Sequence, residues 1–260
     1  MRKRKYEGKF IKLKFHRTYL FVALGFVLTG HYLNLIVFTN LILVHEMGHC
    51  LMALINKIHV DKVVVYPYGG ITKINDMINR DIYEELLIAT SGVIVQYLFY
   101  LMMGLLFNKG LIREYTYNLY TFYSNQMIFF NLLPIYPLDG GKILNLILDR
   151  FLPYYIANMI TILISFIVIL VIVLLCIIAN NYSNIMVIGI LLTYLYKFFA
   201  KRKYLYHKFL LERFLYDIKY PKISVVNNIK NLFKNRSHII RVNNSYIEEK
   251  KYLSTLFIKK

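Results

Sequence analysis

Long apolar runs separated by short polar segments dominate the first 200 residues of the chain. A helix that crosses the hydrocarbon core of a bilayer needs about 20 mainly apolar residues. Runs of about this length predict six membrane spans, at residues 17–30, 32–56, 83–107, 117–147, 154–179 and 184–200. The predicted fold class is therefore an α-helical polytopic membrane protein whose membrane domain is residues 1–200.

Two regions depart from this helical pattern. At residues 63–74, "VVVYPYGGITKI" has two short β-branched runs around a Pro and Gly-Gly turn, which predicts a small β-hairpin beside the membrane. Residues 201–260 alternate strand-like "KISVV", helical "NNIKNLFKN", strand-like "HIIRVNN" and helical "SYIEEKKYLSTLF". The second pattern predicts a linker and a small α/β module that is separate from the membrane domain.

Composition and charge support the membrane assignment. Hydrophobic residues make up 58% of the 260 residues, and the mean hydropathy is +0.48, which is too apolar for a soluble domain of this size. The net charge of +18 comes from the two ends, with eight Lys and Arg against Glu7 in residues 2–17 and fifteen against four acids in residues 201–260. Basic segments that flank membrane spans favour the cytoplasmic side, so both termini are expected there and nucleic acid is not expected as a partner.

The segment "HEMGH" lies inside the second predicted span. Residues four apart share a helix face, so His45 and His49 can ligate one metal ion with Glu46 beside it, which is the geometry of a zinc hydrolase. Ionisable groups deep in a span are rare and usually functional, although hydrogen bonds to neighbouring helices are the alternative explanation.

A catalytic zinc keeps three protein ligands and one open position. The longer motif with three histidines is excluded, because Ile55 stands where its last histidine would be. Asp139 is the best third ligand, because it lies at a matching depth in the fourth predicted span; an N-cap or turn acid is the alternative reading of "PLDGG". The other acids considered, Asp61, Asp76, Asp81, Glu84 and Glu85, fall in or beside a polar loop.

"HEMGH", the Gly-Gly hairpin and "NLLPIYPLDGGKIL" together resemble the site-2 protease family of intramembrane zinc metalloproteases, over roughly residues 17–200. The resemblance implies that His45, His49 and Asp139 bind one Zn²⁺ per chain and that Glu46 is catalytic. It also matches Asn131 and Pro137 to the family's fourth-span motif. Substrate binding is assigned to Asn131, Pro137, Gly69 and Gly70; for Asn131, a helix–helix hydrogen bond is the alternative.

The tail resembles a degenerate cystathionine-beta-synthase-type module, a fold that often senses adenine nucleotides such as ATP. It has room for at most one such unit and contains no glycine.

The expected function is intramembrane proteolysis on the cytoplasmic side. The chain is most similar to the sporulation branch of the family, which implies that the substrate is the sigma-factor precursor pro-sigma-K. It also implies inhibitory membrane partner proteins and a location in the mother-cell membrane around the forespore. The alternative is a zinc transporter or metal-sensing scaffold without protease activity, which should show polar residues along several spans. The fifth span, "ITILISFIVILVIVLLCII", is almost wholly apolar, which favours a single site.

Overall fold

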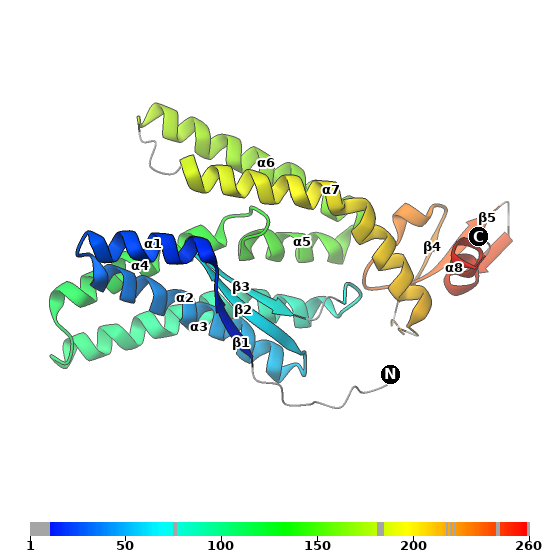
Figure 1. The fold of residues 1–260 in the computed structure, drawn as a ribbon. Helices are drawn as coiled ribbons and strands as arrows, with labels where there is room; N and C mark the ends of the chain where they lie inside the picture. Colours follow the sequence, from blue (N-terminus) through cyan, green and yellow to red (C-terminus); the bar gives the residue numbers. More distant parts are fainter. Residues whose placement is uncertain are drawn as a thin grey trace. The chain divides into compact units, whose positions relative to one another are not determined.

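The computed structural model describes residues 11–74, 77–180, 185–216, 218, 220, 222–242 and 245–258 (Figure 1). Most of the basic N-terminal segment, Asp76 and the last two residues of "HIIRVNN" lie outside these ranges. The helices are α1 (Arg17–Leu28), α2 (Tyr32–Ile55), α3 (Ile82–Asn108), α4 (Glu114–Leu132), α5 (Asp139–Phe151), α6 (Tyr154–Ile178), α7 (Ile185–Leu215) and α8 (Glu249–Phe257). The strands are β1 (Lys12–Phe15), β2 (Val60–Tyr66), β3 (Gly69–Ile74), β4 (Ile223–Val226), β5 (Ser237–Val242) and β6 (Ser245–Glu248).

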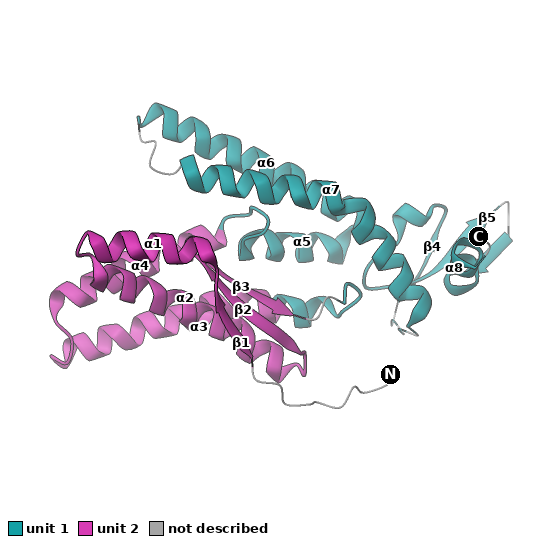
Figure 2. Cartoon of the chain, in the orientation of Figure 1, with its two compact units in different colours: residues 1–3, 77–86, 133–260 teal, residues 4–76, 87–132 magenta. Residues whose placement is uncertain are grey.

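The chain forms two compact units, coloured separately in Figure 2. The hairpin unit comprises residues 4–76 and 87–132, and the tail unit comprises residues 1–3, 77–86 and 133–260.

Three of the described helices, α2, α3 and α6, are long and apolar enough to cross a membrane, and α1 is apolar but shorter. The predicted helix over residues 117–147 is wrong as one element, because the chain leaves the helical path after Leu132 and resumes it at Asp139. Two prolines, Pro134 and Pro137, lie in the gap, and proline removes a backbone donor and clashes with the preceding helical turn. The helix that contains the last predicted span extends beyond it, since α7 continues to Leu215, and the end of that span at residue 200 stays a prediction.

In the hairpin unit, a three-stranded sheet has β2 at its centre. The predicted hairpin is confirmed as the antiparallel pair β2 and β3, whereas β1, which pairs with β2 in parallel, was not predicted. Val63 and Val65 of β2 are buried in the cores that α2 shares with the sheet. Because side chains alternate along a strand, the neighbours of these two valines on β1 and β3 lie on the same face as α2.

The tail unit has its own core, which joins the end of α7 to the C-terminal strands. Its buried residues are Tyr154, Tyr206, Phe209, Leu210, Val226, Leu232, Ile240 and Leu253. Of the predicted tail elements, "NNIKNLFKN" is not an α-helix and contains only a short 3₁₀ turn, Ile229–Asn231. The helix cannot continue because Leu232 is extended and fully buried, and its carbonyl accepts a hydrogen bond from the Tyr154 backbone.

The tail sheet also encloses a buried ion pair. The Arg213 guanidinium donates two hydrogen bonds to the Glu249 carboxylate. The His238 ring accepts from the Phe233 backbone N–H through Nε2, so Nδ1 carries the proton that it donates to Glu249 at 3.0 Å. Arg213 and His238 are both more than nine-tenths buried, so these contacts are well shielded from water. Residues 201–215 therefore belong to a helix that packs on the tail sheet, and an independent module beginning at residue 201 stays a prediction.

We expect Glu249→Gln to loosen the tail sheet. Burial by itself would raise the pKa of Glu249, but the hydrogen bonds from His238 and Arg213 outweigh it and lower the pKa to about 2. A lowered carboxyl pKa stabilises the folded state fully above the ordinary value of 4.5, and this contribution is lost as the pH falls toward 2. At pH 7 the substitution should cost about 3 kcal/mol, measured as faster hydrogen exchange of the β5 amides.

The matched control is Glu248→Gln, because Glu248 is the adjacent residue and is exposed. Equal exchange rates in the two variants at pH 7 would contradict the assigned role of Glu249.

Candidate active site

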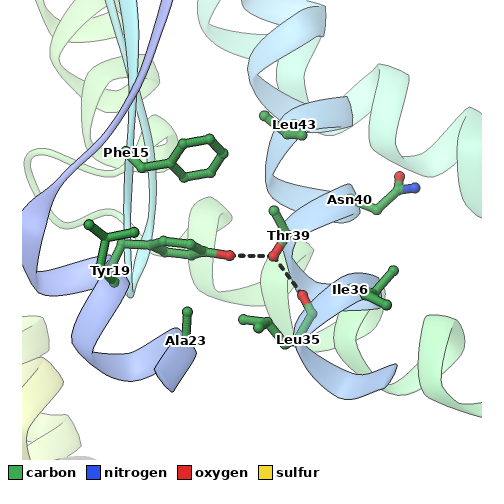
Figure 3. Close-up of a pocket in the computed structure, with 9 residues that line it drawn as sticks. Phe15, Tyr19, Ala23, Leu35, Ile36, Thr39, Asn40 and Leu43 are labelled. Atoms are coloured by element: carbon green, nitrogen blue, oxygen red, sulfur yellow. Dashed lines mark hydrogen bonds between the residues drawn. The ribbon is translucent and has the colours of Figure 1, made fainter. Parts of the chain in front are cut away.

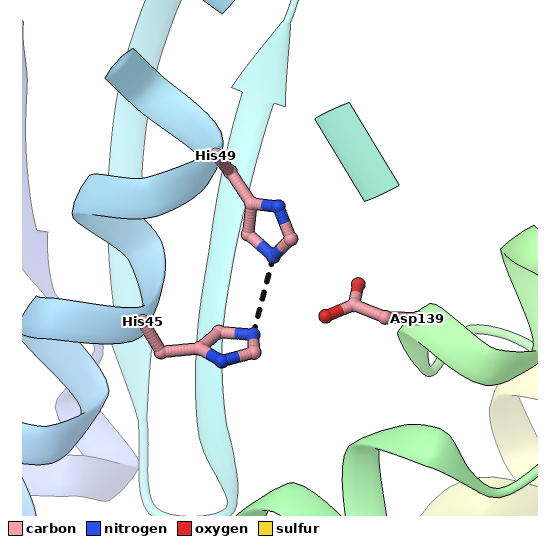
Figure 4. A group of neighbouring side chains, drawn as sticks. All are labelled: His45, His49 and Asp139. Carbon is pink, nitrogen blue, oxygen red and sulfur yellow. Dashed lines mark hydrogen bonds between the residues drawn. The ribbon is translucent and has the colours of Figure 1, made fainter. Parts of the chain in front are cut away.

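Two histidines of α2 form the centre of the site. His45 and His49 are one helical turn apart and are 2% and 5% exposed. Their rings meet edge to face, and their Nε2 atoms, which the dashed line in Figure 4 joins, approach to 3.1 Å. The shared helix face that the sequence predicted is therefore confirmed for these two residues.

Hydrogen bonds on the far side of each ring fix where its proton lies. The His49 Nδ1 atom is 2.7 Å from the Ile88 carbonyl oxygen, which can only accept. The His45 Nδ1 atom is 3.0 Å from Gln96 Oε1, and the Gln96 amide donates from its nitrogen to the Ser124 carbonyl. Both Nδ1 atoms must therefore donate, so in the neutral form of each ring, which is the form that binds a metal, Nε2 carries a lone pair.

Two lone pairs held 3.1 Å apart repel each other unless a cation lies between or beside them. Neutral imidazole nitrogen is a preferred zinc ligand, and a ligating histidine usually donates its other N–H to a carbonyl or carboxylate. The arrangement of His45 and His49 therefore fits a zinc ion. Gln96 is not among the predicted site residues, although an amide in an otherwise apolar helix is a visible signal. Its side chain is fully buried.

Glu46 lies beside the histidines and is held by the hairpin. Its carboxylate is 4% exposed and accepts a hydrogen bond from the Thr72 hydroxyl at 2.5 Å. Thr72 belongs to β3 and was also missed, because its pairing with Val63 places it on the face toward α2 only in the folded sheet. The hairpin therefore orients the carboxylate that the motif places next to His45.

Gly70 of β3 makes room for the same glutamate. A Cβ atom at Gly70 would lie 2.3 Å from Glu46 Cγ, which no side chain permits. Gly69, the residue before it, begins the strand with a φ of 143°. The lack of a side chain at Gly70 therefore leaves space for the Glu46 side chain. The role of both glycines in substrate binding stays a prediction.

Gly92 of α3 has the same relation to the histidines. A Cβ atom there would lie 2.5 Å from His49 Nε2 and 2.8 Å from His45 Nε2. Any larger residue would enter the space in front of both lone pairs. Gly92 is not among the predicted site residues, because the sequence does not indicate which side chains lie next to a single glycine in an apolar helix.

The other predicted site residues, Asn131, Pro137 and Asp139, follow β3 and α3 in the sequence. Asn131 is half-buried in the last turn of α4, and no hydrogen bond joins its amide to another described residue. Pro137 lies in the gap before α5. Asp139 is the first residue of α5, one position after the N-cap Leu138; it is 3% exposed and accepts a hydrogen bond from the Lys142 ammonium at 2.9 Å.

Comparison with known proteins agrees with this chemistry. The model of Peptidase family M50 matches residues 33–114 and 108–175. Stage IV sporulation protein FB of Bacillus subtilis (strain 168) is 31% identical over 198 residues, which are 75% of this chain and 68% of that protein. A zinc metalloprotease of Methanocaldococcus jannaschii is 30% identical over 121 residues, which are 45% of this chain and only 34% of that protein.

A solved structure shows the same fold. The site-2 protease from Methanocaldococcus jannaschii superposes with a TM-score of 0.57 at 23% identity, covering 73% of this chain and 92% of that one. The family match spans more than half of the chain, and its metal chemistry agrees with the paired imidazoles and the adjacent glutamate. The chain belongs to peptidase family M50, the site-2 proteases, and is a membrane-embedded zinc metalloprotease.

Proposed function

We propose that this protease carries out regulated proteolysis of a membrane-associated precursor on the cytoplasmic side, and that the precursor is pro-sigma-K. The proposed peptidase chemistry rests on one observation: the Nε2 atoms of His45 and His49 converge beside the buried Glu46 carboxylate. The similarity to a sporulation protein supports the choice of substrate. Membership in a peptidase family decides against the transporter alternative.

His45, His49 and Asp139 are proposed to hold one Zn²⁺ per chain. All three side chains, drawn in Figure 4, are buried and offer the nitrogen and oxygen donors that catalytic zinc sites use. Of the alternative ligands, Glu85 is already engaged by the Lys234 ammonium at 2.6 Å. Asp139 has a lysine partner as well, but the Lys142 side chain is 48% exposed and can turn to water, whereas that of Lys234 is 3% exposed. Removing Glu85 from Lys234 would leave a buried charge unpaired, which supports Asp139 over Glu85.

Glu46 is proposed as the general base and acid. When bound, zinc supplies a Lewis acid that polarises the scissile carbonyl and makes water a better nucleophile at neutral pH. The Glu46 carboxylate takes the proton from the attacking water and then delivers it to the leaving amine. The Thr72 hydroxyl donates to one carboxylate oxygen, Oε2, so Oε1 is proposed as the oxygen that accepts the proton and then transfers it.

The substrate is proposed to bind as an extended strand on β3. Within the described sheet, the order β1-β2-β3 leaves one side of β3 unpaired, and strand addition satisfies a substrate backbone there. Gly69 and Gly70 are proposed to allow its close approach. Asn131 and Pro137 are proposed to hold substrate backbone groups.

The proposed cellular setting has two sources. Both termini are proposed to face the cytoplasm, because Lys and Arg are concentrated at the two ends of the chain. The mother-cell membrane around the forespore is proposed from the similarity to a sporulation protein. Inhibitory membrane proteins are proposed as partners. The basic tail is proposed to recruit the precursor, and a nucleotide such as ATP is its candidate ligand.

Asp139→Asn tests the metal site. We expect zinc retention and cleavage to fall at least about tenfold, because a neutral amide oxygen is a weaker ligand than a carboxylate. The matched control is Asp149→Asn in the same helix. Asp149 is also buried, and neither of its oxygens has a hydrogen-bond partner among the described residues, so this change should leave zinc and cleavage intact.

Zinc content per chain and the rate of pro-sigma-K cleavage decide the result. A metal-bound structure in which Glu84 or Glu85 ligates the zinc would refute the assignment of Asp139.

A further inference from the structure

Two cavities of the hairpin unit lie along one stripe of α2. The first, shown in Figure 3, has a volume of about 570 Å³ and lies between α1 and α2. It is lined by Phe15, Tyr19, Leu20, Ala23, Leu35, Ile36, Thr39, Asn40 and Leu43. The second, of about 190 Å³, is lined by Ile11, Leu13, Leu43, Glu46, Met47, Cys50 and Val63. Leu43 borders both, and we call the two cavities together the α2 groove.

The stripe of α2 in this groove follows the helical repeat. Ile36, Asn40, Leu43, Met47 and Cys50 are spaced by four and three residues, which places them on one face. Fourteen residues separate the ends of the stripe, so the groove runs about 21 Å along the helix. A peptide extended at about 3.3 Å per residue would fill this length with about six residues.

Strand β1 forms the opposite wall beside Glu46. Leu13 and Phe15 pair with Val63 and Val65, so they project from the same sheet face toward α2. All four residues of β1 are exposed, which leaves this wall uncovered by the described parts of the unit. The wall that β1 contributes is therefore apolar and reaches the cavity beside the proposed catalytic glutamate.

We propose that the α2 groove receives an extended apolar segment of the substrate and leads it toward Glu46. The inference rests on the proposed catalytic role of Glu46, because that residue lines the inner cavity. It adds a second contact surface to the proposed pairing on β3. Leu43 and Met47 are then the residues that select for apolar substrate side chains.

Polar groups in the groove favour a peptide over a lipid chain as its occupant. Thr39 donates to the Leu35 carbonyl, so the Tyr19 hydroxyl must donate to Thr39 and can only accept a further hydrogen bond (Figure 3). The Asn40 amide lines the same cavity and has no hydrogen-bond partner among the described residues. An acyl chain has nothing to offer these groups, whereas an extended peptide presents an N–H and a C=O at every residue.

Photocrosslinking tests the occupant without depending on catalysis. Benzoylphenylalanine is placed at Leu20 or Ile36, one on each side of the groove, or at Leu98 as a control; these three residues are all 58% exposed. The Glu46→Gln protein in lipid vesicles is then irradiated with a fluorescent peptide of Leu, Ala and Gly, too short to span the bilayer. We expect peptide adducts at Leu20 and Ile36 that exceed those at Leu98 at least about tenfold.

Lipid adducts alone at Leu20 and Ile36, or equal peptide adducts at Leu98, would overturn the groove proposal. A second variant, Leu43→Trp, should block the junction of the two cavities and lower these adducts by a similar factor, with zinc content unchanged. Failure of the catalytic proposal gives a different result. In that case the Glu46→Gln protein still cleaves its substrate, while the peptide adducts at Leu20 and Ile36 form as expected.

Discussion

Glu46→Gln should abolish cleavage while the protein keeps its zinc. The substitution leaves both imidazoles and their Gln96 and Ile88 partners in place, so the nitrogen ligands are unchanged. It removes the group that accepts a proton from water, and general acid–base catalysis contributes about a hundredfold to ten-thousandfold to a rate. Cleavage of pro-sigma-K in vesicles and zinc content per chain are the two measurements.

The matched control is Glu114→Gln, which makes the same chemical change at an exposed position at the start of α4. It should cleave like the wild type. Near wild-type cleavage by Glu46→Gln would show that another group moves the proton.

Gly92→Ala should remove the metal, although Gly92 contributes no ligand atom. The added methyl group would lie 2.5 Å from His49 Nε2 and 2.8 Å from His45 Nε2, so at least one ring must turn away. Turning a ring breaks the hydrogen bond of its Nδ1 atom and moves its lone pair out of position. Because disturbing the orientation of a ligand typically costs tenfold to a hundredfold in metal affinity, we expect a loss of about a hundredfold.

Gly104→Ala is the control, since it makes the same change in the same helix. A Cβ atom at Gly104 would meet only the Tyr117 side chain, with 3.6 Å as its nearest approach. Zinc content and thermal unfolding are measured for both variants. If Gly92→Ala bound zinc as tightly as Gly104→Ala, the described placement of α3 against the histidines would be wrong.

The chain itself determined the helix face of His45 and His49, because a four-residue spacing on a helix needs no other part of the protein. It determined the hairpin in the same way, since β-branched runs around a Gly-Gly turn pair locally. The apolar runs also predicted α2, α3 and α6, the three described helices that are long and apolar enough to cross a membrane. The family could be named at this level because these local motifs carry the zinc chemistry.

Tertiary structure alone decided what surrounds those motifs. Gln96 and Thr72 reach His45 and Glu46 from 51 and 26 residues away along the chain, and no spacing rule links them. The helix break before Asp139 has a local cause in Pro134 and Pro137. A prediction from hydrophobicity alone continues the helix through them, because hydrophobicity takes no account of the backbone N–H that proline lacks. The 3₁₀ turn at Ile229–Asn231 replaced a predicted helix because the Leu232 carbonyl bonds to a distant backbone N–H. At Leu232 a contact between distant segments outweighed a local preference, since burial and hydrogen bonding in the core exceed the small differences in helix propensity.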